Sequence, residues 1–137
     1  MKQKTKFNLE DGLVAYATMI IRLVSHLPSN RIGNYVAGRL LEAGTLPLAI
    51  QAEAEEAGSI ADFIATFRSC LQHLRVARRW LLLIKKIPLI KAVSAIDIAV
   101  KETDGLMKIF TTGILAAEQR AREKQESSSP NGSETTP

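Results

Sequence analysis

The chain has 137 residues, enough for one domain that buries a core without disulfides or bound metals. Its 18 lysines and arginines outnumber its 14 acidic residues, which gives a net charge of +4 and a pI of about 9.4. The single cysteine, Cys70, excludes an internal disulfide framework, and because it lies among apolar residues we expect a buried structural thiol. This cysteine usage fits a location in the reducing cytoplasm. No run of about eighteen apolar residues is present, so we expect no membrane-spanning helix.

Apolar residues recur at helical intervals along most of the chain, and no segment alternates with period two for long enough to indicate a sheet. The first helix is expected from about Asp11, which can cap it, to Leu27, where the turn-forming sequence Pro-Ser-Asn ends it. A second helix should run from about Asn30 to Ala43.

The sequence predicts an interruption of this second helix at residues 44–47, which read Gly-Thr-Leu-Pro. Pro47 has no amide hydrogen and is tolerated best in a first helical turn, so Thr45 is expected to cap a new helical segment. Helix then resumes to about Ala57.

The third helix is expected from Ile60 to about Ile87, where Pro88 stops it. Ser59 and Asp62 have the spacing of a capping box at its start. Its predicted core face consists of Phe63, Phe67, Cys70, Leu74, Ala77 and Leu81. A second apolar side, expected in part to meet another subunit, consists of Trp80, Leu83, Ile84 and Ile87.

The fourth helix is expected over about residues 92–120. From residue 125 onward the composition is dominated by Ser, Pro, Asn, Gly, Thr and Glu, which predicts a disordered tail. The expected organisation is a flexible basic N-terminus over residues 1–10, a helical domain over 11–120, and a helix end with a polar tail over 121–137. Four helices with short connections predict an all-α, antiparallel up-and-down four-helix bundle.

The third helix carries an uneven charge distribution, because the segment from Phe63 to Leu89 contains six basic residues and no acid. The six are Arg68, Arg75, Arg78, Arg79, Lys85 and Lys86. At about 100° per residue, a subset falls within about 40° on the helix surface, namely Arg68, Arg75, Arg79 and Lys86. An ordinary exposed helix would carry compensating acids one turn away. The pattern predicts a positive face that binds RNA or DNA through phosphate contacts, in a salt-dependent and sequence-tolerant way.

Other interpretations of this basic segment stay open. An acidic surface of a partner protein could dock on it, without any nucleic acid. Acids of an adjacent subunit, such as Glu53, Glu55 and Glu56, could bury it, in which case it would hold an oligomer together. A plain solvated face is the remaining alternative.

No constellation of catalytic or metal-binding residues is recognisable in the chain. His26 and His73 have no nucleophile and acid that the sequence places beside them, and we expect capping or surface roles for both. The acids of residues 53–62 lack the Glu-x-x-His spacing of a di-metal site in a helical bundle. Gly33 and Gly38 have the spacing of a phosphate-binding loop without its Lys-Ser/Thr, so close helix packing is the better explanation. We therefore expect no enzymatic activity, no cofactor and no small-molecule substrate.

One pattern of moderate specificity runs through the middle of the chain. It consists of Gly44-Thr45, Ala49, Glu53-Ala54, Ala57-Gly58-Ser59, Asp62-Phe63, Leu71 and Arg78-Arg79-Trp80-Leu81. It resembles the four-helix bundle proteins of the 23S rRNA intervening-sequence family, whose pattern is close to S-G-T-S-x-x-A-N-x-x-E-A, then S-x-x-D-F, then R-Y/F-W-L. The Leu27-Pro28 turn and Gly33 also look like the first loop of that family, and the resemblance covers about residues 13–118. The chain departs from the pattern at Pro47, at Ile50, where Asn is usual, and at Val76, where Glu is usual.

The resemblance implies an antiparallel four-helix bundle that assembles into a homopentameric ring and has no enzymatic activity. Related basic bundles are accessory proteins of diversity-generating retroelements, in which the pentamer binds a reverse transcriptase and nucleic acid. We therefore expect a non-catalytic oligomer that binds nucleic acid, in the retroelement version as a scaffold that joins a reverse transcriptase to its template RNA. The alternative is a protein–protein interaction module of the intervening-sequence family.

Overall fold

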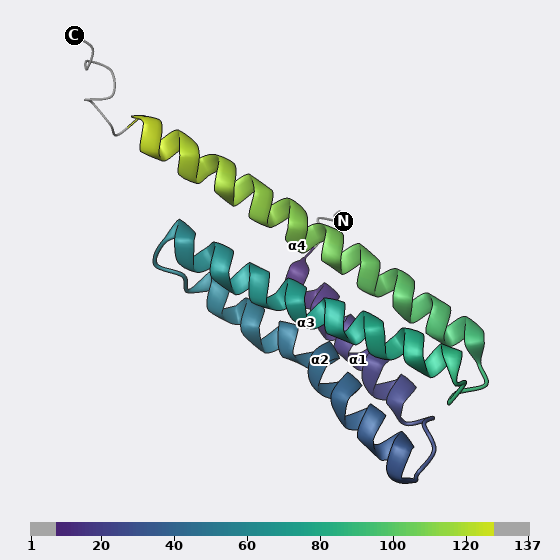
Figure 1. Ribbon diagram of the computed structural model, residues 1–137. Coiled ribbons are helices and arrows are strands. Elements are labelled where there is room, and N and C mark those ends of the chain that lie inside the picture. The colour runs from purple at the N-terminus through teal and green to yellow at the C-terminus, as the bar shows by residue number, and fades with distance from the viewer. Residues whose placement is uncertain (1–7, 128–137) are drawn as a thin grey trace, which may run out of the picture.

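The computed structural model describes residues 8–127 of the chain. This range folds into four α-helices and contains no strand; the helices are α1 (Leu9–Val24), α2 (Arg31–Glu55), α3 (Ile60–Lys86) and α4 (Val93–Ser127). Consecutive helices lie side by side and are joined by short loops, with α3 between α2 and α4 (Figure 1). Helix α1 packs mainly on α2 and touches α4 much less. The predicted all-α four-helix bundle is confirmed for the described residues.

Side-chain caps fix where the helices begin. The predicted cap at Asp11 is wrong, because Asn8 lies before the first turn and its Oδ1 accepts a hydrogen bond from the Asp11 amide at 3.1 Å. Asn30 caps α2 in the same way. Ser59 caps α3 as predicted, with its hydroxyl oxygen accepting from the Asp62 amide at 3.0 Å. Each cap satisfies one of the amides that a helix start leaves without an intrahelical partner.

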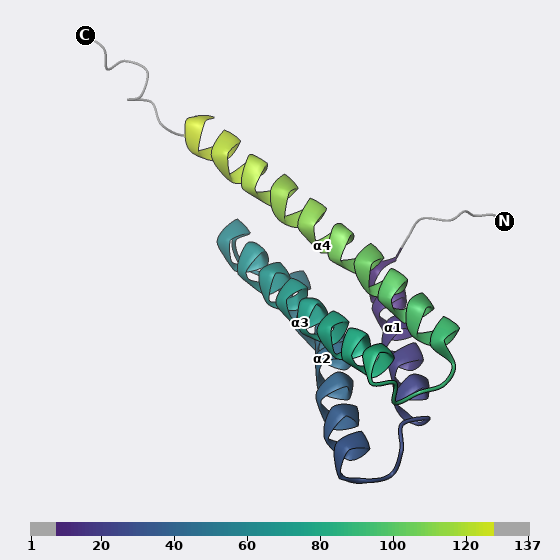
Figure 2. The same ribbon diagram turned by 45° about the vertical axis from the view of Figure 1, so that its right-hand side comes forward.

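The predicted interruption at residues 44–47 is wrong, because α2 continues through it with Pro47 inside the helix. Thr45 does not cap a new segment; its hydroxyl donates to the Leu41 carbonyl at 2.7 Å. A proline inside a helix removes one backbone hydrogen bond and crowds the preceding turn, so the helix bends. Figure 2 shows α2 changing direction along its length. Pro47 is fully buried, and the Cys70 thiol of α3 donates to its carbonyl at 3.6 Å, so packing against α3 outweighs the local preference for a break.

Helix α4 is longer than predicted and extends beyond the other helices at its C-terminal end (Figure 1). Residues 125–127, expected in the tail, form its last turn, because the preceding Ala, Glu, Gln, Arg and Lys residues all favour helix. The remainder of the predicted tail and residues 1–7 of the predicted N-terminal segment lie outside the described residues.

The core follows the length of α3. Five of the six residues of its predicted core face are buried, and the sixth, Phe63, is partly buried and packs against them. Phe67 contacts the Phe63 ring at a centroid distance of 4.2 Å and the Phe110 ring of α4 at 4.7 Å. These rings connect the cores of α3 and α4.

Close approaches explain some of the glycines. A Cβ atom at Gly33 would lie 1.8 Å from the Pro28 carbonyl oxygen, and one at Gly44 would lie 2.9 Å from Cγ1 of Ile20 in α1. The expected close packing is therefore confirmed for Gly33, although its neighbour is the turn before α2 and not a helix. It is wrong for Gly38, which is exposed and would have nothing within 4 Å of a Cβ atom.

One polar pair connects α1 to α4 inside the core. The Thr103 hydroxyl donates to the Ala99 carbonyl at 2.7 Å, so its single proton is used there. The Tyr16 hydroxyl, 2.6 Å away, must then be the donor to Thr103 Oγ1. Burial raises the pKa of Tyr16 to about 12, which keeps the phenol neutral and able to donate.

Candidate nucleic-acid interface

The six predicted basic residues all lie on α3, but the structure divides them into two groups of three. One group forms ion pairs with acids of α4. The pairs are Arg68 with Glu118, Arg78 with Asp104 (Nε to Oδ1, 2.6 Å) and Lys85 with Asp97 (Nζ to Oδ1, 2.7 Å). The hydrogen bond that Arg78 donates to Asp104 raises the pKa of its guanidinium. All three pairs are partly exposed, so each stabilises the fold by about 1 kcal/mol or less, but each also neutralises a positive charge.

The second group consists of Arg75, Arg79 and Lys86, which we call the free basic stripe. All three are exposed, and none forms an ion pair with any acid among residues 8–127. They were predicted to be collinear with Arg68, which instead pairs with Glu118 of α4. The free basic stripe is therefore the part of the predicted site whose charge is available to a ligand.

The compensating acids were missed because they lie on a different helix from the basic segment. Asp97 and Asp104 are seven residues apart, and Glu118 follows after two further heptads, so all three share one side of α4. The heptad spacing of these acids was visible in the sequence. Pairing them with the basic residues of α3 required knowing the register of α4 against α3.

Beside the free basic stripe, α2 and α3 enclose a groove that the sequence did not predict. Tyr35 is 56% exposed, and its ring meets the Trp80 ring edge to face at a centroid distance of 6.0 Å. The Arg39 guanidinium carbon lies 5.4 Å from the centre of the Tyr35 ring. The groove has a volume of about 360 Å³, and its other lining residues are Glu42, Ala43, His73 and Val76. We call it the aromatic groove.

The apolar residues of α3 that were expected to meet another subunit have different environments. Ile84 is fully buried in the core of its own chain. Leu83 and Ile87 are 40% and 48% exposed, and Trp80 lines the aromatic groove. Only part of the predicted surface is therefore open to another molecule.

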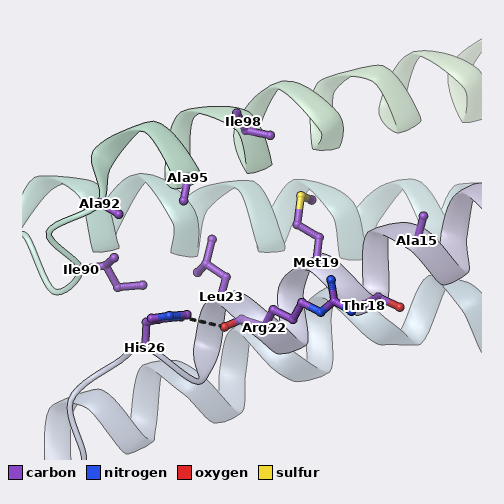
Figure 3. Close-up of a pocket in the computed structure, with 10 residues that line it drawn as sticks. All are labelled: Ala15, Thr18, Met19, Arg22, Leu23, His26, Ile90, Ala92, Ala95 and Ile98. Carbon is purple, nitrogen blue, oxygen red and sulfur yellow. Dashed lines mark hydrogen bonds between the residues drawn. The ribbon is translucent and has the colours of Figure 1, made fainter.

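A larger and more apolar cavity of about 560 Å³ lies between α1 and the start of α4 (Figure 3). Met19 and Leu23 of α1 point toward Ile98 and Ile90 across it. It exists because α1 packs so little on α4. At its edge the His26 ring donates from Nδ1 to the Arg22 carbonyl at 3.0 Å, which is the expected helix-end role for this histidine.

His73 and Cys70 are the remaining candidate groups. The His73 ring donates from Nδ1 to the Ser69 carbonyl at 2.8 Å. Cys70 is fully buried, and burial raises the pKa of its thiol to about 12, which disfavours the reactive thiolate. Within residues 8–127, no cluster of three or more His, Cys, Asp or Glu side chains could hold a metal ion. None of the helices described here has the length and apolarity to cross a membrane.

No protein-family model and no curated protein matches the chain. Among solved structures, it is similar to a protein of unknown function from the S23 ribosomal protein family of Bacteroides thetaiotaomicron VPI-5482. The two chains are 23% identical with a TM-score of 0.72, and the similarity covers 78% of this chain and 98% of the other. At this identity the similarity shows the fold, a four-helix bundle spanning nearly the whole of the other protein.

Proposed function

We propose that the chain is a non-catalytic, antiparallel four-helix bundle that forms a homo-oligomer and binds nucleic acid through the free basic stripe. The observation that carries this proposal is the alignment of three exposed cations on α3 with no acid partner in the described chain. Arg75 and Arg79 supply guanidinium groups that can contact phosphate through two hydrogen bonds each, and Lys86 adds a point charge.

The ion pairs narrow the predicted site. Arg68, Arg78 and Lys85 are already hydrogen-bonded to carboxylates, so a phosphate would have to displace an acid to reach them. We expect these three residues to contribute less to binding than the free basic stripe. The net charge of +4 adds a long-range attraction that brings the polyanion to the surface.

Oligomer formation is supported by the apolar surface that a single chain leaves uncovered. Ile98 of α4 lines the cavity between α1 and α4 and is 57% exposed, and Val14 and Ile21, elsewhere on α1, are 44% and 51% exposed. A second copy that covers this surface would bury it, and a ring of identical copies would repeat the free basic stripe around its circumference. The family resemblance suggests five copies and, in the retroelement version, a reverse transcriptase as the protein partner, while the single cysteine fits a cytoplasmic location.

A second candidate function is that the free basic stripe binds acids of a neighbouring copy. Glu53 and Glu56, at the end of α2, are exposed and form no ion pair among the described residues, while Glu55 accepts a hydrogen bond from Gln51 at 3.3 Å. In that case the stripe would hold the oligomer together, and nucleic acid would bind weakly.

The test is a fluorescence anisotropy titration with a labelled RNA at two salt concentrations, with oligomeric mass measured by light scattering. The test variant changes Arg75, Arg79 and Lys86 to Gln. The control variant changes three exposed cations on the other helices to Gln, so that both variants lose the same net charge; these are Arg31, Lys101 and Arg120.

We expect the test variant to lose more than about ten-fold in affinity and to show a salt slope that is smaller by about two to three units, because each lost phosphate contact removes about one. The control variant should keep its affinity within about three-fold. Equal losses of affinity in both variants would mean that binding depends on net charge and not on the position of the cations. Absence of binding by the native protein would refute the proposal, and dissociation of the test variant into single chains would favour the second candidate.

A further inference from the structure

We propose that the aromatic groove holds an unpaired base, so that the ligand of the free basic stripe is a single-stranded nucleic acid. This inference rests on the proposed function and adds the class of nucleic acid to it. It depends on the position of Tyr35 and Trp80, which come from different helices and meet at the protein surface.

The Tyr35 and Trp80 rings meet edge to face and do not stack face to face. Their planes make an angle of 74°. Tyr35 keeps 56% of its surface exposed, although it lies within α2, near the start of the helix, beside the apolar residue Val36. An exposed aromatic ring of this kind is suited to stacking with a planar base.

The polar groups around the rings also fit a base. The Arg39 guanidinium lies over the Tyr35 ring, where a base could stack beside it, and an ion pair of 3.8 Å links it to Glu42, so this edge of the groove is close to neutral. A phosphate gains little beside a carboxylate, whereas a base can accept from the guanidinium and donate to the carboxylate. His73 lines the groove and donates its Nδ1 proton to the Ser69 carbonyl, so Nε2 is the ring nitrogen left for a base.

The groove is next to the free basic stripe. Val76 lines the groove and Arg79 follows it by three residues on α3, so the two side chains are neighbours on the helix surface. A nucleotide can therefore place its base between α2 and α3 while its phosphate meets Arg79. In a duplex the bases are stacked on each other and paired, so their faces cannot enter the groove, and only the phosphate contacts remain.

Trp80 makes the inference directly measurable, because it is the only tryptophan in the chain. The experiment titrates the full chain with a 20-nucleotide oligo(U) and with an RNA duplex of matched phosphate count, and it records Trp80 fluorescence together with affinity. We expect the single strand to quench Trp80 and to bind about ten-fold more tightly than the duplex, as stacking of one base predicts.

The test variant is Tyr35→Ala, and its matched control is Ile32→Ala, a similarly exposed residue one turn earlier on α2 and outside the groove. Tyr35→Ala should lower the affinity for oligo(U) about ten-fold and leave the affinity for the duplex unchanged, whereas Ile32→Ala should change neither. Circular dichroism checks that both variants remain folded.

Three results would overturn the inference, and they can be told apart. If single strand and duplex bind equally and Trp80 fluorescence stays constant, the groove does not bind a base. Phosphate binding by the free basic stripe would still stand. Absence of binding by either RNA would refute the proposed function as well. A change in Trp80 fluorescence with protein concentration alone would show that a protein surface, namely a second copy, covers the groove.

Discussion

Replacing Gly33 with alanine should destabilise the protein far more than the same change at Gly38, five residues later in the same helix. At Gly33 a Cβ atom would lie 1.8 Å from the carbonyl oxygen of Pro28 and 2.8 Å from its carbonyl carbon. Non-bonded heavy atoms normally approach to about 3.5 Å, so the turn before α2 must move by more than about 1 Å. At Gly38 the added atom would meet nothing within 4 Å.

The size of the difference follows from three contributions. Moving the turn disturbs the hydrogen bond of 2.8 Å from the Gly33 amide to Asn30, which caps α2, and loss of a cap costs about 1 kcal/mol. Strain from overpacking costs about 2 kcal/mol, while the higher helix propensity of alanine stabilises the helix by up to about 1 kcal/mol. We therefore expect Gly33→Ala to lower the free energy of unfolding by about 2 kcal/mol and Gly38→Ala to raise it by about 0.5–1 kcal/mol.

The measurement is thermal and urea unfolding followed by circular dichroism, with all variants at one protein concentration because association adds to apparent stability. A separation of about 3 kcal/mol corresponds to roughly 10 °C in Tm for a domain of this size. If the two variants unfold at the same temperature, the turn relaxes without cost and the account of Gly33 is wrong.

Further predictions concern the core and the helix ends. Gly113→Ala would place a Cβ atom 2.6 Å from the Phe67 ring and should lower the free energy of unfolding by about 1–2 kcal/mol, measured by urea titration. Ser59→Ala removes the cap that accepts from the Asp62 amide and should cost about 1 kcal/mol in the same assay; an unchanged midpoint would contradict this. Folding raises the pKa of Tyr16 from 10.0 to about 12, so the unfolded chain releases the phenol proton at a lower pH than the folded chain. The contribution of Tyr16 to the free energy of unfolding is therefore complete below pH 10 and is lost as the pH rises to 12. Tyr16→Phe should therefore show a shallower loss of stability between pH 10 and 12, by up to about 3 kcal/mol, and parallel curves would refute this assignment.

The parts of the fold that depend on local pattern could be predicted from the sequence. Helical periodicity of apolar residues is a property of each segment, so four helices and the core face of α3 were identified correctly. Residues that can cap a helix are also local, although Asn8 and Asp11 are both good caps three residues apart, and the sequence favoured the wrong one.

What could not be predicted depends on how helices meet. Pro47 disfavours helix locally, yet burial against α3 keeps α2 continuous. The division of the basic residues into paired and unpaired groups needs the register of α4 along α3. The aromatic groove needs contact between Tyr35 and Trp80, which are far apart in the sequence and carry no shared pattern.

Because Cys70 is buried, the rate of its chemical modification can report how often the surrounding helices separate. Cys70 is the only thiol in the chain, it is fully enclosed, and it faces the carbonyl of Pro47 in the bent part of α2. A thiol reagent can reach it only when α2 and α3 separate there, so the rate of modification reports how often this helix pair opens. While the pair stays closed, neighbouring copies in an assembly cannot become crosslinked through this sulfur, and oxidants in solution do not reach it.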